Sequence, residues 1–468
     1  MGSSTDPGAS LTMDNTIGEV VSQTTPNLLW ICSDQQTGNA LGCVNSFLST
    51  PNLDDLVNRG VHFDRAYCTQ PVCGPSRASM MTGRMPVETG VTRNGSGPEE
   101  FVDRSIGTLV RDAGYEAVHA GKWHLPSYHE AAEANQYGFD VLCNLNDEKV
   151  PGACARFFAE HDGERPFFMS AQLHNPHNII EWGRNQPLPW SGEISDVSTE
   201  ECPPLPQNFP IPPFEPGPIE GYRDTTRTHR GAIATEWSDE VWRHYRHAYF
   251  RLVERVDDAV GEILDALTAH GLREETVIIF TSDHGEMNGA HKLNQKYTLY
   301  DESVRVPLII DAPGEYHGIA NQLVSTGLDL LPTFCDYAGA NTPNDLIGRS
   351  LRPIIHGESP EWRDAVFAET HNYKLNGRMV RTDRYKYTVY GLGRYREQLF
   401  DMKQDPGEMV NLATDARHSD VLQFHRELLA DWCVETGDLY GEQSERPGVP
   451  AIPGISFEAM EERFGVTR

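Results

Sequence analysis

Two short apolar runs, each followed by polar residues, stand out in the pattern of hydrophobic positions along the chain. Residues 27–32 (Asn-Leu-Leu-Trp-Ile-Cys) precede Ser-Asp-Gln-Gln at 33–36, and residues 277–280 (Val-Ile-Ile-Phe) precede Thr-Ser-Asp-His at 281–284. Continuous apolar runs of this length are typical of strands that are buried on both faces of a parallel sheet. Because open α/β sheets bind ligands at the carboxyl ends of their strands, we expect both polar segments to lie at a functional edge.

Helical and strand-like patterns alternate between these two runs. Residues 105–114 predict a helix that ends at a glycine, and residues 115–120 and 166–173 predict strands. A longer helix is predicted at about 239–270, with Gly271 as its C-cap. Its apolar face would carry Val253, Val256, Val260, Ile263, Leu264 and Leu267. The alternation predicts an α/β fold with a large, mostly parallel central sheet flanked by helices.

Two regions depart from this alternation. Residues 187–218 are rich in proline and almost without periodic pattern, which predicts an extended loop and no folded element. Such a loop could wall a functional site or be a surface excursion without a role. From about residue 360 the chain changes to short β-like runs, such as 384–390, and ends in a helix near 421–432. This change predicts a smaller C-terminal α+β subdomain built on an antiparallel sheet.

The predicted domain boundaries follow from these changes. A chain of 468 residues can bury the core of a large main domain and a smaller second one. The residues up to Thr12 lack a basic n-region and an apolar h-region and resemble an added leader, with Met13 as the native start of a cytoplasmic protein. A trimmed signal peptide would leave the same sequence in a periplasmic or secreted protein. We expect a leader or disordered segment at 1–25, the main α/β domain at 26–358, and the C-terminal subdomain and tail at 359–468.

Charge and cysteine content restrict the classes of function. The chain has 39 basic and 68 acidic residues and a formal charge of -29, and a field of that sign repels nucleic acid and anionic membranes. No apolar run approaches the roughly 20 residues that span a bilayer. We therefore predict no nucleic-acid or membrane partner, and an anionic substrate would need a locally basic pocket. The nine cysteines are odd in number and lack tight spacing, which argues against a disulfide framework and favours a reducing compartment.

The segment that begins at Cys73 is the strongest candidate for chemistry. Cys-Gly-Pro-Ser-Arg at 73–77 continues into Ala-Ser-Met-Met-Thr-Gly-Arg at 78–84, a tight turn that opens into a helical pattern. Cys73 is therefore predicted at a helix N-terminus, where free N–H groups and the helix dipole favour an anion bound beside Cys73 and Arg77. Considered alone, a cysteine at a helix start could also be a low-pKa thiolate or a buried structural thiol.

Cys-x-Pro-Ser-Arg followed by Thr-Gly-Arg resembles the motif by which the type I sulfatase family, in the alkaline phosphatase superfamily, marks a cysteine for oxidation to formylglycine. Further segments that resemble family blocks occur in the expected order, at 52–56, 121–125, 175–177, 281–286, 302–307 and 405–412. The resemblance runs from about residue 27 to 412. It implies hydrolysis of sulfate esters, and it implies a partner that modifies Cys73, either a formylglycine-generating enzyme or an anaerobic sulfatase-maturating enzyme.

The resemblance also implies one divalent metal ion at the two strand ends. Its ligands would be Asp34, Gln35, Asp283, His284 and the modified Cys73, although an aspartate at a strand end is otherwise more often a helix cap or turn former. The commonest family pattern has a second aspartate in place of Gln35 and an asparagine in place of His284. Calcium, the family default, prefers oxygen ligands, whereas one imidazole and fewer carboxylates leave manganese and magnesium as alternatives.

A covalent mechanism is implied for the residues around Cys73. The hydrated aldehyde of residue 73 would present two hydroxyls, of which one attacks sulfur with Asp283 as its base and forms a formylglycine–sulfate intermediate. Arg77, Lys122 and Lys296 would neutralise the sulfate oxygens.

The resemblance assigns the proton transfers to histidines. His177, with Lys296, would protonate the departing alcohol, and His124 would take the proton of the second hydroxyl so that sulfate is expelled. His174 is the alternative to His177. Four other polar residues have no assigned role: Asn94 and His291 could line the pocket or close turns, and Glu369 and His371 could contact the organic part of the substrate.

Three functions are compatible with these features. The leading prediction is hydrolysis of a sulfate ester of a carbohydrate or another small organic molecule. A phosphonate monoester or phosphodiester hydrolase shares the fold and the modified cysteine, but the presence of both Lys122 and Lys296 favours sulfate by resemblance. The third is a non-catalytic binder of anionic glycans in which Cys73 is never oxidised, because a fold alone does not dictate function.

Overall fold

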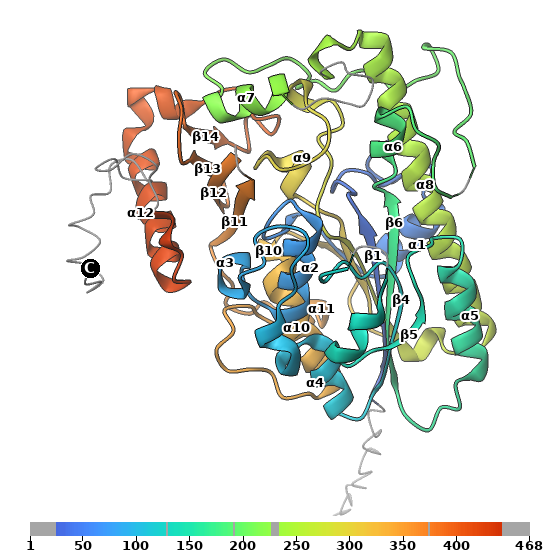
Figure 1. Ribbon diagram of the computed structural model, residues 1–468. Coiled ribbons are helices and arrows are strands. Elements are labelled where there is room, and N and C mark those ends of the chain that lie inside the picture. The colour runs from blue at the N-terminus through green and yellow to red at the C-terminus, as the bar shows by residue number, and fades with distance from the viewer. Residues whose placement is uncertain (1–24, 128–129, 191, 226–233, 373–374, 442–468) are drawn as a thin grey trace, which may run out of the picture.

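An eight-stranded sheet forms the centre of the protein (Figure 1). The computed structural model describes residues 25–127, 130–190, 192–225, 234–372 and 375–441. The predicted leader, with Met13, and the end of the predicted C-terminal tail lie outside these residues. The strand order is β5-β4-β6-β1-β7-β8-β2-β9. The strands are β1 (Asn27–Asp34), β2 (Val61–Phe63), β4 (Glu116–Gly121), β5 (Asp140–Cys143), β6 (Phe167–Pro176), β7 (Thr276–Ser282), β8 (Leu308–Asp311) and β9 (Gly318–Ala320).

Strand direction confirms the predicted parallel sheet. The five strands from β5 to β7 pair in parallel, and β8 alone runs antiparallel to both of its neighbours. The two apolar runs of the sequence form β1 and β7, which are adjacent, with Ser33 opposite Ser282. The polar residues that follow both strands therefore meet at one edge of the sheet.

Helices cover both faces of this sheet (Figure 1). One face packs against α1, α5 and α8, and the other packs against α2, α4 and α10. The predicted apolar face of α8 lies in the first of these cores from Val256 onward, with Leu264 only partly buried, whereas Val253 packs in a separate cluster with Tyr249. The six helices on the two faces are α1 (Pro51–Arg59), α2 (Cys73–Thr82), α4 (Ile106–Asp112), α5 (Val150–Glu160), α8 (Asp239–Ala269) and α10 (Thr326–Ala338). The shorter helices are α3 (Pro86–Thr89), α6 (Ile179–Gly183), α7 (Gly217–Thr225), α9 (Asp301–Val304) and α11 (Arg352–Ile355).

A four-stranded antiparallel sheet with one long helix forms the C-terminal part, as predicted (Figure 1). Its elements are β11 (Ala365–Asn372), β12 (Leu375–Thr382), β13 (Tyr385–Tyr390), β14 (Glu397–Asp401) and α12 (Ser419–Glu435). Side chains of α12 pack on one face of the sheet, whereas Val366, Met379 and Phe400 belong to the same core as β1 and α2. The boundary at residue 358 stays a prediction, because this core runs across it. A parallel pair, β3 (Ala66–Tyr67) and β10 (Val324–Ser325), lies beside the main sheet.

The proline-rich segment follows an irregular path, with one correction. The described residues between 187 and 216 form no helix or strand. Residues 217 and 218, predicted as the end of the loop, are instead the first two residues of α7. Proline is favoured in the first turn of a helix, where its missing N–H is not needed, so Pro218 starts α7 instead of extending the loop. Phe209 holds the loop to α8 through an edge-to-face contact with Trp242 at 5.8 Å.

The described part of the chain carries neither a membrane-spanning helix nor a disulfide bond. Of the helices found there, none combines the length and the apolar composition that crossing a bilayer requires. All nine cysteines are free thiols.

Candidate active site

Cys73 is the first residue of α2, at the carboxyl edge of the central sheet. Its neighbour Gly74 donates its backbone N–H to Asn94 Oδ1 at 2.8 Å. A Cβ atom at position 74 would lie 2.9 Å from that same oxygen, so glycine allows the loop around Asn94 to approach the start of α2. Asn94 thus closes the turn beside Cys73, one of the two roles left open for it. The helix ends at Gly83, which adopts the left-handed conformation typical of a C-cap.

Four predicted metal ligands converge beside Cys73. One ligand atom from each of Asp34, Cys73, Asp283 and His284 lies within 4.8 Å of all the others, and all four side chains are buried. Asp34 ends β1, and Asp283 and His284 directly follow β7. His284 Nδ1 is 2.9 Å from the carbonyl oxygen of Gly285, which leaves Nε2 directed at Cys73 Sγ, 3.3 Å away. Carboxylate oxygens and one imidazole nitrogen suit a hard or borderline divalent cation, so the donor set fits the implied metal.

Gln35 completes this group of donors through its side-chain oxygen. Its Oε1 accepts a hydrogen bond from Lys296 Nζ at 2.8 Å, and the same ammonium lies 3.0 Å from Cys73 Sγ. The backbone of Gln35 is left-handed, with φ of 74°. Its N–H donates to Asp283 Oδ1 at 3.1 Å, and its carbonyl accepts from the hydroxyl of Tyr249 at 2.9 Å. These bonds hold a conformation that a residue with a side chain seldom adopts.

Cations pair with the outer oxygens of the two aspartates. Arg77 Nε donates to Asp283 Oδ2 at 2.9 Å, and Lys122 Nζ donates to Asp34 Oδ2. The Oδ1 atoms of both aspartates are left facing His284 Nε2, at 3.6 and 3.8 Å. Burial alone would raise the pKa of Asp34, but the nearby cations, Lys122 foremost, hold that pKa well below its usual range. Burial and the charge of Asp34 raise the pKa of Asp283 to about 6.

The environment of Cys73 favours a negative charge at this position. Burial and the Asp34 carboxylate would raise the pKa of the thiol. Lys296, Lys122 and His284 outweigh both effects, and the pKa lies well below its usual range. We name Arg77, Lys122 and Lys296 the cationic clamp. Their side chains are at most 4% exposed, so their charges act in a medium that screens them weakly. These three cations make the surroundings of Cys73 locally basic, as an anion would need in an acidic protein.

Three histidines surround the same position. His124 and His177 both interact with the Cys73 side chain by hydrogen bonding. His174 lies 3.3 Å from Lys122 Nζ, through its Nδ1, and its ring centroid is 4.5 Å from that of His177. Burial, then Lys296, lowers the pKa of His177 to about 3, and burial also lowers the pKa values of His124 and His174. Burial therefore disfavours the protonated form of all three rings, and of the two neighbours His174 and His177 it is His177 that hydrogen-bonds the Cys73 side chain.

One residue of the proline-rich loop reaches this group. Trp190 is half-buried, and its ring contacts His174 edge to face at a centroid distance of 5.5 Å. The loop therefore contacts the group around Cys73 at this point, and a role in walling the site stays a prediction.

His291 packs against an aromatic side chain in the interior of the protein. It is fully buried, and its ring stacks on Tyr300 at a centroid distance of 4.0 Å. Within the described residues, neither ring nitrogen has a hydrogen-bond partner. Burial, with the charges of Arg223 and Lys386, lowers the pKa of His291 to about 3.

We expect His291→Phe to reduce the acid sensitivity of the fold. A pKa that is lower in the folded than in the unfolded state, where it is about 6.5, stabilises the protein above pH 6.5. This contribution is lost as the pH falls from 6.5 towards 3, and about 2 kcal/mol is gone at pH 5. Free energies of unfolding from urea titrations at pH 7 and pH 5 check this. The parent should lose about 2 kcal/mol more than the variant, and equal losses would contradict the assignment.

Glu369 and His371 make contacts within the protein. Glu369 Oε1 accepts the backbone N–H of Val87 at 2.8 Å, and Glu369 Oε2 lies 3.2 Å from His371 Nε2. Glu369 therefore ties β11 to α3, and contact of either residue with a substrate stays a prediction.

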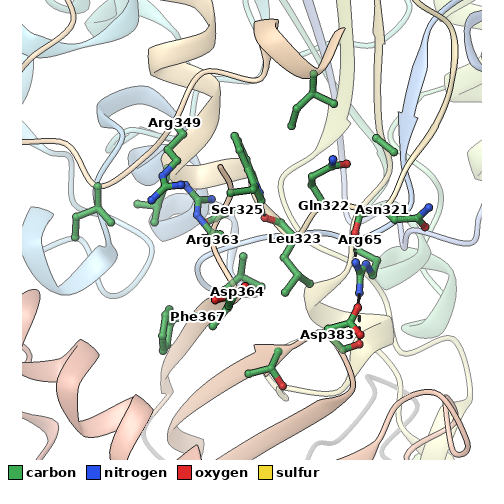
Figure 2. Close-up of a pocket in the computed structure, with 18 of the residues that line it drawn as sticks. Arg65, Asn321, Gln322, Leu323, Ser325, Arg349, Arg363, Asp364, Phe367 and Asp383 are labelled. Carbon is green, nitrogen blue, oxygen red and sulfur yellow. Dashed lines mark hydrogen bonds and ion pairs between the residues drawn. The ribbon is translucent and has the colours of Figure 1, made fainter. Parts of the chain in front are cut away.

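A large cavity lies away from Cys73, between β11 and the segment 319–325 (Figure 2). Its volume is about 1370 Å³, and it shares no described lining residue with the group around Cys73. The arginines that line it already have partners: Arg65 pairs with Asp383 at 2.8 Å, and Arg363 Nη2 donates to Asp329 at 2.6 Å. Size alone therefore does not make this cavity the reactive site.

Sequence reasoning missed several residues of the site. Glu286 accepts a hydrogen bond from Gln35 Nε2 at 2.5 Å, and Gln172 Oε1 accepts one from Arg77 at 3.0 Å. Glu286 lay inside the block 281–286 and Gln172 inside a predicted strand, so both could have been suspected. Tyr245, which donates to Glu286 at 2.8 Å, is part of the helical pattern of α8 and gave no such signal.

Comparison with protein families and curated proteins covers nearly the whole chain. A family model described as "Sulfatase" matches residues 26–340, and one described as "N-sulphoglucosamine sulphohydrolase, C-terminal" matches residues 289–433. A Delta 4,5-hexuronate-2-O-sulfatase from Bacteroides thetaiotaomicron is 33% identical over 471 residues, which are 92% of this chain and 95% of the relative.

Solved structures share the fold. A 2-O GAG sulfatase has a TM-score of 0.80 and 30% sequence identity, over 94% of this chain and 100% of that one. A phosphonate monoester hydrolase of Agrobacterium radiobacter has a TM-score of 0.71 and 25% identity, over 88% of this chain and 96% of that one. Both classes of hydrolase considered from the sequence are thus represented among the neighbours.

Proposed function

The chain belongs to the sulfatase family and is a sulfuric ester hydrolase, and we propose that its substrate is a sulfated carbohydrate. The observation that carries this proposal is the cationic clamp, which surrounds position 73 at the N-terminus of α2. A sulfate group carries its charge on several oxygens, and three fixed cations beside a helix N-terminus match that distribution. The hexuronate sulfatase among the relatives supports a carbohydrate, and a sulfated uronic acid in particular.

We propose that Cys73 is oxidised to formylglycine. In hydrated form, this residue supplies a nucleophilic hydroxyl and a second hydroxyl from which the aldehyde can re-form. The buried position of Cys73 between Lys296 and His284 supports the proposal, because it keeps the nucleophile out of bulk water.

A single divalent metal ion would be held by Asp34, Gln35, Asp283, His284 and residue 73. When bound, it would stabilise negative charge on the nucleophile and on the sulfate oxygens. Calcium is proposed first, because four of the five ligands, Asp34, Gln35, Asp283 and the formylglycine at position 73, supply oxygen; manganese and magnesium stay alternatives.

Side chains of the protein would bind the sulfate and transfer the protons. The cationic clamp would bind and orient the sulfate, and Asp283, whose pKa is raised by burial and by Asp34, would take a proton from residue 73. A bound sulfate ester brings negative charge next to His177, which raises the pKa of that imidazole and allows it to donate a proton to the leaving oxygen. His124, also beside residue 73, accepts the proton of the second hydroxyl.

The test is release of inorganic sulfate from a panel of sulfated mono- and disaccharides. We expect turnover with at least one sulfated sugar, and a uronic acid sulfate is the first to try. An aryl sulfate and an aryl phosphonate ester, assayed side by side, separate the two hydrolase classes. Faster cleavage of the phosphonate would overturn the assignment to sulfate, and hydrolysis of aryl sulfate without any sulfated sugar would overturn the carbohydrate.

A further inference from the structure

Glu286 is a buried carboxylate with four hydrogen-bond donors that the mechanism above does not use. Oε2 accepts from Gln35 Nε2 at 2.5 Å. Oε1 accepts from the Tyr245 hydroxyl at 2.8 Å and from the backbone N–H groups of Asn288 at 3.2 Å and Gln295 at 2.6 Å. Glu286 is 0% exposed, and its position is fixed by the residue that follows β1, by α8 and by the loop after β7.

The carboxamide of Gln35 lies between two partners of opposite character. Its nitrogen faces Glu286, and its oxygen accepts from Lys296 Nζ at 2.8 Å. A carboxylate can only accept hydrogen bonds and an ammonium can only donate them. If the amide were rotated by 180°, its oxygen would face the Glu286 carboxylate and its nitrogen would face the Lys296 ammonium, so neither hydrogen bond could form. Glu286 and Lys296 therefore fix which end of Gln35 points toward Cys73.

We propose that Glu286 is a positioning residue that holds the side-chain oxygen of Gln35 toward the metal pocket. This inference rests on the metal site of the proposed function and does not depend on the identity of the substrate. The geometry supplies the reason: without the carboxylate, the amide loses the partner of its nitrogen and gains freedom to rotate its oxygen away. A ligand that must be reoriented binds a cation more weakly, and loss of such a supporting partner typically weakens metal binding by about 10- to 100-fold.

Tyr245, in α8, helps to hold the Glu286 carboxylate in place. Its hydroxyl donates to the Glu286 oxygen that does not contact Gln35. Tyr245→Phe keeps the carboxylate and removes one of its four donors, so it should perturb Gln35 less than Glu286→Gln does.

The test is a double-mutant cycle read by metal affinity. Protein freed of metal by a chelator is titrated with Ca²⁺ and with Mn²⁺ in a calorimeter. Glu286→Gln should weaken binding of the ion that the parent prefers by about 10- to 100-fold. In a Gln35→Ala background, the same substitution should change affinity by less than about threefold, because the group it positions is gone.

Each outcome bears on the proposal. Equal losses in both backgrounds, or parent-like affinity of Glu286→Gln, would overturn it, as would a parent that binds neither ion. Glu369→Gln, at another buried carboxylate that accepts a backbone N–H, is the matched control and should bind metal as the parent does. If Glu286→Gln does not fold, Tyr245→Phe takes its place in the cycle, with a fewfold loss expected only when Gln35 is present. Failure of this cycle leaves sulfate release intact as a separate readout of the proposed function.

Discussion

Cys73→Ser is expected to lower steady-state turnover by at least about 10⁴-fold, the scale of loss seen when a covalent nucleophile is removed. A serine at this position can still receive a sulfate group on its hydroxyl. It lacks the second hydroxyl from which the hydrated aldehyde expels sulfate, so the ester persists. Release of inorganic sulfate measures the loss. Intact mass after incubation with substrate should show the variant heavier by one sulfo group.

The matched control is Cys68→Ser, five residues earlier. Cys68 is also buried, and burial raises the pKa of its thiol well above the usual value, so it is an inert thiol. We expect this variant to keep parent-like turnover. Sustained turnover by Cys73→Ser would contradict the two-hydroxyl mechanism.

Lys296→Met is expected to reduce kcat/KM by about 10²- to 10³-fold, the usual effect of removing one preorganised donor from an active site. The ammonium touches Cys73 Sγ at 3.0 Å and Gln35 Oε1 at 2.8 Å, and it is 2% exposed, so water cannot replace it. Methionine has a similar length and carries no charge. The assay is sulfate release with the best sugar of the panel.

Lys292→Met provides the control from the same loop. The Lys292 ammonium lies over the ring of Phe209, 5.3 Å from its centroid, and is not part of the cationic clamp. We expect the kcat/KM of Lys292→Met to stay within about twofold of the parent, because this ammonium lies over Phe209 and is not one of the three cations around Cys73. A Lys296→Met variant within tenfold of the parent would remove Lys296 from the clamp.

Much of the main domain could be predicted because its signals are local. The apolar runs before Ser33 and Thr281 are long enough to show strands buried on both faces, and the turn at Gly74 and Pro75 shows where α2 begins. Polar residues after parallel strands lie at the same edge of the sheet, so the edge that holds Asp34 and Asp283 followed from the pattern, whereas the adjacency of β1 and β7 did not. Their proposed ligand and catalytic roles came from family resemblance instead.

Long-range contacts could not be predicted from these signals. Gln35 and Glu286 are 251 positions apart, and no periodicity in either segment shows that their side chains meet. Trp190 lies in a loop without pattern, yet it contacts His174. The sequence also did not show that the C-terminal sheet shares a core with the main domain. The apolar pattern of its strands predicts a buried face but does not show which residues of the main domain cover that face.

The chemical form of residue 73 in active protein tests most directly whether Cys73 is oxidised to formylglycine. Trypsin should release the peptide 66–77, Ala-Tyr-Cys-Thr-Gln-Pro-Val-Cys-Gly-Pro-Ser-Arg, which holds both Cys68 and Cys73. After alkylation of thiols, protein from its native host should yield this peptide with one alkyl group, on Cys68, and an aldehyde at position 73. A peptide with two alkyl groups throughout, from protein that is fully active, would contradict the account.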